Sequence, residues 1–240
     1  KEEITPSDEN KTKEEITPTD EDKTTTPKED KNVALVYDVP NSVSVTIDGE
    51  TKEYYVIDQA FTAAQGKTAT ITMLSDSTAL ASSYSIQKDT NITFEGGNYT
   101  LNCSAEVILL GSTFTLKSGT INANFTVKEN GNIIIEDGTT LGNDSNTLSI
   151  ENGTAEIKGG TISKLVINSN SVENVTLSGG TFKNGITIDG GTEEQLKSLL
   201  ASGYEYHTAD GKLFTDFSGG TIDEEIRVVE KCDHMCNLEG

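Results

Sequence analysis

The residues best suited to chemistry lie near the C-terminal end, in the segment Cys232-Asp233-His234-Met235-Cys236. Thiolates and imidazoles are common zinc ligands, so Cys232, His234 and Cys236 could supply three of the four ligands of a zinc site. A fourth ligand is not evident. In an oxidising compartment Cys232 and Cys236 could instead form a disulfide. The sequence leaves a zinc site, a disulfide and the start of a further segment open, and we predict no metal and no other cofactor.

A pair of carboxylates, Glu95 and Glu136, could act as acid and base on a glycosidic bond. If the repeat described below stacks coil on coil, they lie two strands apart, or about 9.6 Å. That distance is near the upper limit for an inverting glycosidase. Lys117 falls between them, however, so mutual charge pairing is the better interpretation of these three residues.

Other reactive groups are scattered along the chain. His207 and His234 are the only histidines, and no Gly-x-Ser-x-Gly nucleophile motif is present. Three aspartates that could bind calcium, Asp137, Asp144 and Asp189, are expected in different corners of the fold. We therefore predict no catalytic, cofactor-binding or metal-binding residue.

The net charge and the lack of long apolar runs exclude several classes of binding partner. The 240 residues include 39 acidic and 18 basic side chains, for a formal charge of -21. Nucleic acid and anionic membranes would be repelled by this charge, so we expect neither as a partner. Arg227 is the only arginine. No run approaches the roughly 18 apolar residues that a membrane-spanning helix needs, so we expect no membrane insertion.

The first 24 residues are one 12-residue unit written twice, KEEITPSDENKT and KEEITPTDEDKT. Up to Asn32 the only large apolar residues are Ile4 and Ile16. Such a segment buries too little apolar surface to offset its chain entropy. We predict that residues 1–32 form a disordered acidic linker.

A short phrase that returns five times decides the fold prediction. Its copies begin 22, 19, 22 and 20 residues apart and carry glycine at the sixth place; they start at Ile92, Phe114, Ile133, Ala155 and Val175. A repeat near 21 residues made of short strands is typical of a solenoid. We predict an all-β fold, a right-handed parallel β-helix with short capping helices. An antiparallel sandwich is the alternative, but it does not require a glycine at one fixed place in every unit.

If the coils stack in register, the sequence predicts which side chains face inward and which face outward. The inward pairs are Ile92/Phe94, Phe114/Leu116, Ile133/Ile135, Ala155/Ile157 and Val175/Leu177. One outward column reads Glu95, Lys117, Glu136, Lys158 and Ser178, whose alternating charges we interpret as a device that fixes register. A second outward column reads Thr93, Thr115, Ile134, Glu156 and Thr176, and its two interruptions weigh against an ice-binding surface. The five repeat glycines, Gly97, Gly119, Gly138, Gly160 and Gly180, should turn one corner of the coil.

The flanking segments complete the predicted organisation. Residues 33–69 contain a hairpin, turning at Asp48-Gly49 and returning from Tyr54, and a capping helix. Coils occupy residues 70–191. Residues 192–231 hold a helical insertion, opened by the capping box Thr192-Glu193-Glu194-Gln195, and a final coil on Asp216–Ile222. Residues 232–240 are a C-terminal tail.

Four features carry a resemblance to a known family: Ile57-Asp58-Gln59-Ala60-Phe61, the recurring Gly-Gly-Thr-Ile/Phe units, Leu199-Leu200-Ala201-Ser202-Gly203-Tyr204, and Ala209-Asp210-Gly211-Lys212 after it. Over roughly residues 45–229 the chain resembles parallel β-helix modules of pectate-lyase-like architecture in large surface proteins of Gram-positive gut bacteria. The resemblance implies an extracellular protein, secreted or attached to the cell wall. It does not imply catalysis, because one fold serves many functions.

These observations lead to two functional hypotheses. We expect a non-catalytic, monomeric cell-surface module, an adhesive or a spacer, that binds a glycan or a host protein. The alternative is a carbohydrate-active enzyme, a polysaccharide lyase or glycosidase, with its site in the corner loops after Asn102, Leu141 or Asn168.

Overall fold

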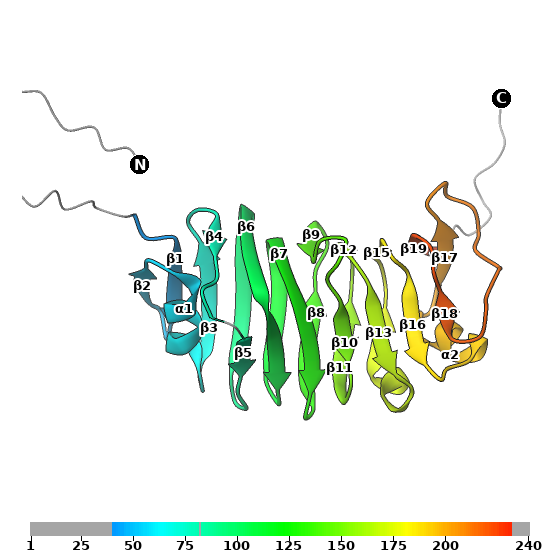
Figure 1. Ribbon diagram of the computed structural model, residues 1–240, viewed down its shortest axis with the longest axis horizontal. Coiled ribbons are helices and arrows are strands. Elements are labelled where there is room, and N and C mark those ends of the chain that lie inside the picture. The colour runs from blue at the N-terminus through cyan, green and yellow to red at the C-terminus, as the bar shows by residue number, and fades with distance from the viewer. Residues whose placement is uncertain (1–39, 82, 232–240) are drawn as a thin grey trace, which may run out of the picture. The chain divides into compact units, whose positions relative to one another are not determined.

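The computed structural model describes residues 40–81 and 83–231 (Figure 1). Two predicted segments lie outside this part of the chain: the linker of residues 1–32 and the tail of residues 232–240. The possible zinc ligands or disulfide partners Cys232, His234 and Cys236 belong to that tail.

The described chain winds as a β-solenoid of about six turns, with three strand segments in each turn. The first sheet holds β3 (Thr68–Met73), the start of β6 (Asn91–Leu110), the start of β7 (Thr113–Lys128), β8 (Gly131–Ile135), β11 (Gly153–Ile157) and β14 (Val175–Leu177). The second holds β4 (Ser77–Thr78), the middle of β6 and β7, β9 (Thr139–Leu141), β12 (Thr161–Ile162) and β15 (Thr181–Phe182). The third holds β5 (Ser83–Ile86), the ends of β6 and β7, β10 (Leu148–Ile150), β13 (Leu165–Asn168) and β16 (Ile186–Asp189). The predicted parallel β-helix with a coil of about 21 residues is therefore confirmed.

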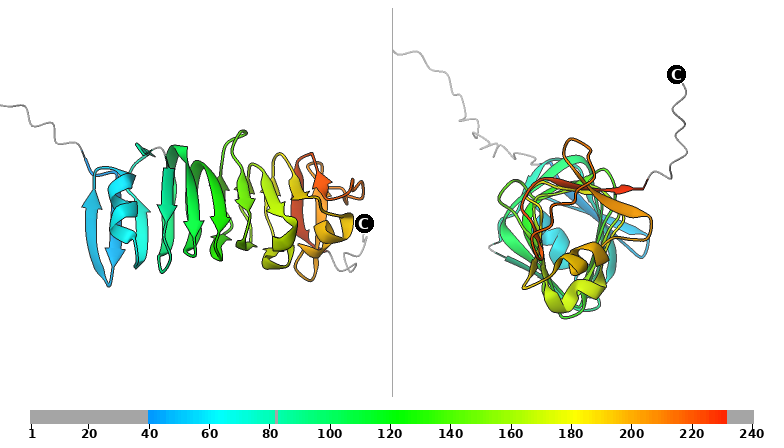
Figure 2. Two further views of the ribbon diagram at one scale, coloured as in Figure 1. Left: turned by 60° about the horizontal axis from the view of Figure 1, so that its bottom comes forward. Right: turned by 90° about the vertical axis from the view of Figure 1, so that its right-hand side faces the viewer.

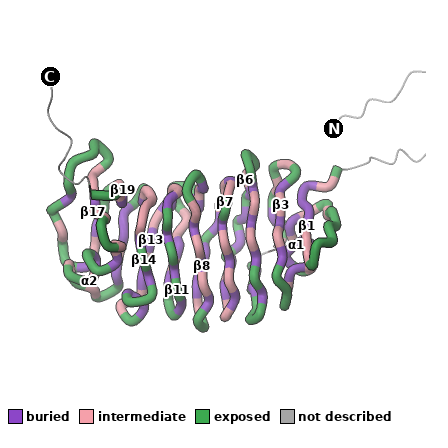
Figure 3. The backbone as a smooth tube through the Cα atoms, turned by 180° about the vertical axis from the view of Figure 1, so that it is seen from behind, coloured by how far each residue is buried: buried purple, intermediate pink, exposed green. Residues whose placement is uncertain are grey.

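Side chains stack in the predicted register. Ile92 pairs with Phe114, and the column continues through Ile133, Ala155 and Val175. All ten predicted inward residues are buried, and the alternation of buried and less buried positions is visible along every coil (Figure 3). Full burial of one such large side chain contributes about 1.5–3 kcal/mol. The coils follow one another along a common axis (Figure 2), and their buried apolar side chains form one continuous core.

The corner between the first and second sheets depends on glycine. All five predicted glycines have positive φ. Gly119 shows both reasons for the choice: its φ is +89°, and a Cβ there would lie 2.5 Å from the Cα of Gly96 in the preceding coil. Any other residue would meet backbone strain and a backbone clash at once.

The N-terminal end is closed by a hairpin and a helix. Strands β1 (Val43–Ile47) and β2 (Glu50–Tyr54) pair antiparallel, and β1 also pairs antiparallel with β3. The return strand begins at Glu50, earlier than the predicted Tyr54, because Asp48 and Gly49 both have positive φ and form a two-residue turn. Helix α1 (Ile57–Ala64), the predicted capping helix, then turns its apolar side towards the core.

Two side chains from the α1 region satisfy backbone groups that the first coil leaves at its edge. The amide of Gln65 donates to Ser85 O at 3.2 Å and accepts from Gln87 N at 3.0 Å, so it replaces a neighbouring strand. The carboxylate of Asp58 accepts from the backbone N–H groups of Leu80 and Ala81, at 3.2 and 2.8 Å. This end of the third sheet is thus closed by side chains rather than by another strand.

The C-terminal end reverses the chain. Helix α2 (Glu193–Ser198) has the predicted capping box, in which the Thr192 side chain and backbone both bond to Gln195. The predicted final coil is wrong: β18 (Thr221–Ile222) pairs antiparallel with β16, and β19 (Ile226–Glu230) pairs antiparallel with β15. The reason is the path of β17 (Tyr204–Thr208), which carries the chain across the end of the stack, so that it returns from the third sheet to the second.

Candidate functional site

The charge column on the first sheet forms pairs rather than a continuous ladder. Lys117 Nζ lies 2.7 Å from Glu95 Oε1, and Lys158 Nζ lies 3.1 Å from Glu136 Oε1. A β-bulge at Lys117 sets Glu95 opposite Ser118, and among the described residues no ion pair joins Lys117 to Glu136. The hydrogen bond that Lys117 donates to Glu95 raises the pKa of Lys117, and the one that Lys158 donates to Glu136 raises the pKa of Lys158. Both carboxylates are therefore held by lysines, but the predicted pairing of Lys117 with both of them is met only for Glu95, since Glu136 pairs with Lys158 instead.

The second sheet carries an unbroken threonine ladder, which was not among the predicted surface columns. Five outward threonines pair from coil to coil in register: Thr100, Thr120, Thr140, Thr161 and Thr181. All five are half-buried, and Thr181 is followed by Arg227 of β19. On the first sheet, by contrast, Ile134 and Glu156 interrupt the threonine column as predicted. A threonine that follows the corner glycine by one to three residues was the signal for the ladder on the second sheet.

Two of the three corner loops proposed for an enzyme site are occupied by their own contacts. After Asn102 the chain buries Cys103, which is 4% exposed, and this burial raises the pKa of its thiol. After Leu141 the side chain of Asn143 accepts from Ser145 N and Oγ, and Asn146 Oδ1 accepts from Asn143 N. These hydrogen bonds fold the loop onto itself.

The third corner, after Asn168, borders a small cavity. The 3-10 helix η1 (Ser169–Asn174) begins there, and the cavity of about 220 Å³ is lined by Ser149, Ile150, Glu151, Val166, Asn168 and Asp189. Asn168 pairs with Asp189 in register. Glu151 is bound by Lys128, whose Nζ lies 3.1 Å away. This cavity brings two carboxylates, Glu151 and Asp189, to one face of the third sheet.

The aspartates considered for calcium lie apart. Asp137 Oδ1 accepts from Gly160 N at 3.4 Å, Asp144 accepts through its backbone oxygen from Asn184, and Asp189 lies in the small cavity. Within residues 40–81 and 83–231, no three His, Cys, Asp or Glu side chains come together in an arrangement suited to a metal ion. In that same part of the chain, no helix is long and apolar enough to cross a membrane.

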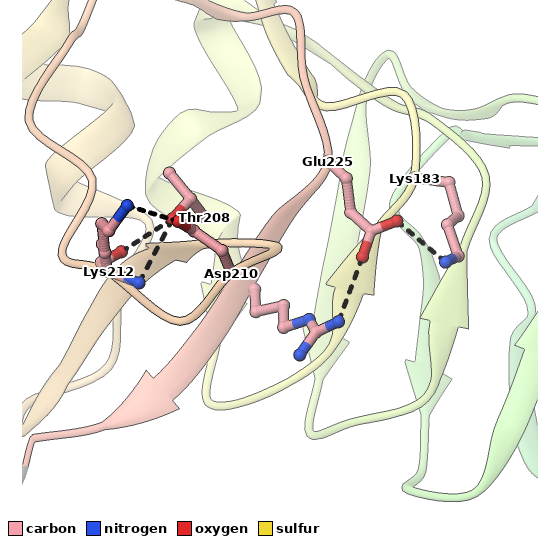
Figure 4. A network of polar contacts seen from close by, with 6 residues as sticks. Lys183, Thr208, Asp210, Lys212 and Glu225 are labelled. Atoms are coloured by element: carbon pink, nitrogen blue, oxygen red, sulfur yellow. Dashed lines mark hydrogen bonds and ion pairs between the residues drawn. The ribbon is translucent and has the colours of Figure 1, made fainter.

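The remaining predicted candidates lie in the C-terminal cap. His207 is held between Glu205 Oε1, 2.8 Å from its Nε2, and Gly211 O, 3.0 Å from its Nδ1. Arg227 Nη2 lies 3.3 Å from Glu225, and Lys183 Nζ lies 2.8 Å from the same carboxylate (Figure 4). The hydrogen bond from Lys183 lowers the pKa of Glu225. These contacts join the returning strand β19 to the stack.

A groove of about 590 Å³ lies on the C-terminal cap. The apolar part of its lining is Leu200, Ala201, Tyr204, Tyr206, Leu213, Phe214 and Phe217; the rest is Glu193, Lys197, Ser202, Gly203, Glu205, Thr215 and Lys231. No local sequence pattern predicts this groove, because its lining comes from a helix, a strand and a loop that only the folded cap brings together.

Comparison of the chain with protein-family models, with curated proteins and with solved structures gives no match. The β-helix architecture therefore rests on the strand pairing itself.

Proposed function

We propose that the chain is a non-catalytic module of a cell-surface protein, an adhesive or a spacer, that binds a glycan or a host protein. In this proposal the module is monomeric and extracellular, and is either secreted or attached to the cell wall. The resemblance to pectate-lyase-like surface modules of gut bacteria supports this setting.

The observation that carries the proposal is the threonine ladder of the second sheet. Strand spacing places its hydroxyl groups about 4.8 Å apart, which gives a regular surface of donors and acceptors along the solenoid. A regular surface of this kind suits contact with an extended partner better than chemistry at one point. Catalysis instead needs several different groups that converge on one reacting atom.

Closure of both ends supports the monomeric state. The N-terminal edge of the first sheet is covered by the antiparallel hairpin β1–β2, and the last parallel strands β15 and β16 are covered by β19 and β18. Open edges of parallel sheets would otherwise pair with another copy. Size-exclusion chromatography with light scattering should therefore give one chain per particle.

A glycan array, combined with an assay for new reducing ends and unsaturated products, tests the proposal. Binding without any product supports it, and turnover of a polysaccharide refutes it. Thr140→Lys, in the middle of the ladder, should reduce adhesion. The control Thr93→Lys places the same side chain at a half-buried strand position on the first sheet and should leave adhesion unchanged.

The cavity after Asn168 favours one second candidate, a glycosidase. Its carboxylates Glu151 and Asp189 lie two coils apart, about 9.6 Å by strand spacing, near the range of an inverting pair. This candidate predicts product formation that Glu151→Gln abolishes. Product that persists in Glu151→Gln would exclude this pair.

A further inference from the structure

The groove on the C-terminal cap is built on a fixed aromatic floor. Tyr206, 2% exposed, donates its hydroxyl to Leu196 O at 2.8 Å and so ties β17 to α2. Phe217 lies against Tyr206 and Phe214, with ring centroids 6.1 and 5.0 Å away and interplanar angles of 67° and 85°. These edge contacts hold the ring of Phe217 in place. The floor therefore exists before any ligand arrives.

Part of this floor is open to solvent. Phe217 and Tyr204 are only half-buried, and Leu213 is 55% exposed. The ammonium of Lys197 lies 4.9 Å from the centre of the Phe217 ring and also pairs with Glu193. A long, exposed lysine side chain can swing away at low cost, so a ligand could replace it on the ring face.

The charges around the groove balance although those of the chain do not. Its lining includes two carboxylates, Glu193 and Glu205, and two ammonium groups, Lys197 and Lys231. The whole chain, in contrast, carries 39 acidic and 18 basic side chains. The groove thus offers hydrogen-bond acceptors and donors side by side, with no local excess of either charge.

We infer that this groove binds a neutral pyranose unit of a glycan. A pyranose ring has one face of C–H groups that fits an aromatic floor, and hydroxyl groups that both donate to carboxylates and accept from ammonium groups. The volume of about 590 Å³ falls within the roughly 300–1,000 Å³ of small-ligand sites. An anionic glycan is disfavoured because the acidic chain repels it. An apolar peptide would offer the four charged groups of the rim no hydrogen bonds beyond those that Glu193 makes with Lys197 and Glu205 makes with His207.

This inference deepens the proposed function, since it names a ligand class for the module, but it uses a site separate from the threonine ladder. Saturation-transfer NMR and calorimetry on the full chain test it, with cellotetraose, maltotetraose and mannotetraose as neutral probes and tetragalacturonate as the anionic probe. We expect millimolar or tighter binding of at least one neutral probe and weaker binding of tetragalacturonate. No binding of any neutral probe, or stronger binding of tetragalacturonate, would overturn the inference.

Substitutions in the groove test whether the sugar binds there. Phe217→Ala should weaken binding at least about tenfold, as loss of a central aromatic contact does. Tyr99→Ala, which removes a 40% exposed ring far along the chain from the cap, serves as the matched control and should bind as the parent does. If Phe217→Ala does not fold by circular dichroism, Glu193→Gln and Lys231→Ala test the rim, and each should weaken binding. Equal affinity in a folded Phe217→Ala protein, or in both rim variants, would refute the groove.

Failure of this inference can be told from failure of the proposed function. Thr140→Lys should leave sugar binding by the groove unchanged, and Phe217→Ala should leave adhesion through the ladder unchanged. If the probe is bound at the groove but shortened, the non-catalytic proposal fails while the groove stands as a sugar site.

Discussion

The coil stack and the two caps obtain their stability in different ways. In the stack a buried residue meets its counterpart about one coil away, as Phe114 meets Ile92 and Ile133 in the neighbouring coils. In the caps each important contact occurs once: Gln65 on the edge of β5, Asp58 on the loop before it, and Tyr206 on α2. In the stack the same kind of apolar contact recurs in every coil. A cap must instead provide hydrogen-bonding partners for a particular set of backbone groups at the edge of the sheet. The stack should therefore lose most stability from a lost apolar contact, and the caps should respond to polar changes and to pH.

The largest expected effect is that of Phe114→Ala in the stack. This ring is fully buried and lies between Phe94 and Phe125, with centroids 6.1 and 5.4 Å away. The cavity should lower the free energy of unfolding by about 3–5 kcal/mol, measured by denaturant unfolding. In the C-terminal cap, Tyr206→Phe removes only the hydrogen bond to Leu196 O and should cost about 0.5–1.5 kcal/mol. An equal loss in the two variants would contradict the contrast between stack and cap.

Two glycines with nearly the same φ, one in the stack and one in the C-terminal cap, allow the two regions to be compared by the same substitution. Gly119 in the stack has φ +89° and Gly203 in the cap has φ +86°, but only Gly119 has backbone atoms near the position of a Cβ. Gly203→Ala should therefore show left-handed strain alone, about 1–2 kcal/mol. Gly119→Ala should add a clash with Gly96 and lose about 1–3 kcal/mol more. Thermal and denaturant unfolding of both variants measure the difference, and a smaller loss for Gly119→Ala would show that the coils can separate to admit a methyl group.

The same contrast explains what the sequence could reveal. The register of the stack was predictable because each inward pair recurs after about 21 residues, so five copies agree on one arrangement. The segment Gly219-Gly220-Thr221-Ile222 carries the same phrase, yet β18 runs antiparallel, because strand direction there depends on the path of α2 and β17. The partners of Gln65 and the lining of the groove likewise come from distant segments, with no local pattern. A sequence repeat thus predicts how successive coils pair with one another. It does not predict the structure of the caps at the two ends of the stack.

A smaller effect, confined to acid pH, is expected at the N-terminal cap. Partial burial opposes ionisation of Asp58, but hydrogen bonds from the Tyr84 hydroxyl and from the Leu80 and Ala81 N–H groups outweigh it and lower its pKa. A carboxyl whose pKa is lower in the folded state stabilises the protein above its unfolded pKa, near 3.9, and this contribution is lost as pH falls through the folded value. Asp58→Asn should therefore be less stable than the parent at pH 7, and the difference should shrink below about pH 4. Unfolding midpoints across pH 2–7 measure it, and a constant difference would contradict the role of the charge.

The smallest effect is expected from the charge pairs on the outside of the stack. Lys117→Glu removes the ion pair with Glu95 and places a third carboxylate between Glu95 and Glu136, so the unfolding midpoint should fall. The loss should diminish as salt is added, because exposed charges are screened. The hydrogen bond to Glu95 raises the pKa of Lys117, so its contribution is complete below the unfolded value near 10.4 and is lost as pH rises through the folded value.

A matched control separates the ion pair from net charge alone. Lys88→Glu makes the same change of net charge at an exposed lysine for which the described residues show no ion pair, and it should change the midpoint less. The exchanged pair Glu95→Lys with Lys117→Glu should recover most of the loss, because it restores opposite charges across the two coils. If the exchange restores stability, attraction between the coils is what matters at these positions. If Lys117→Glu equals Lys88→Glu at every salt concentration, the charges do not contribute to register, and the apolar column with its glycine corner must set it unaided.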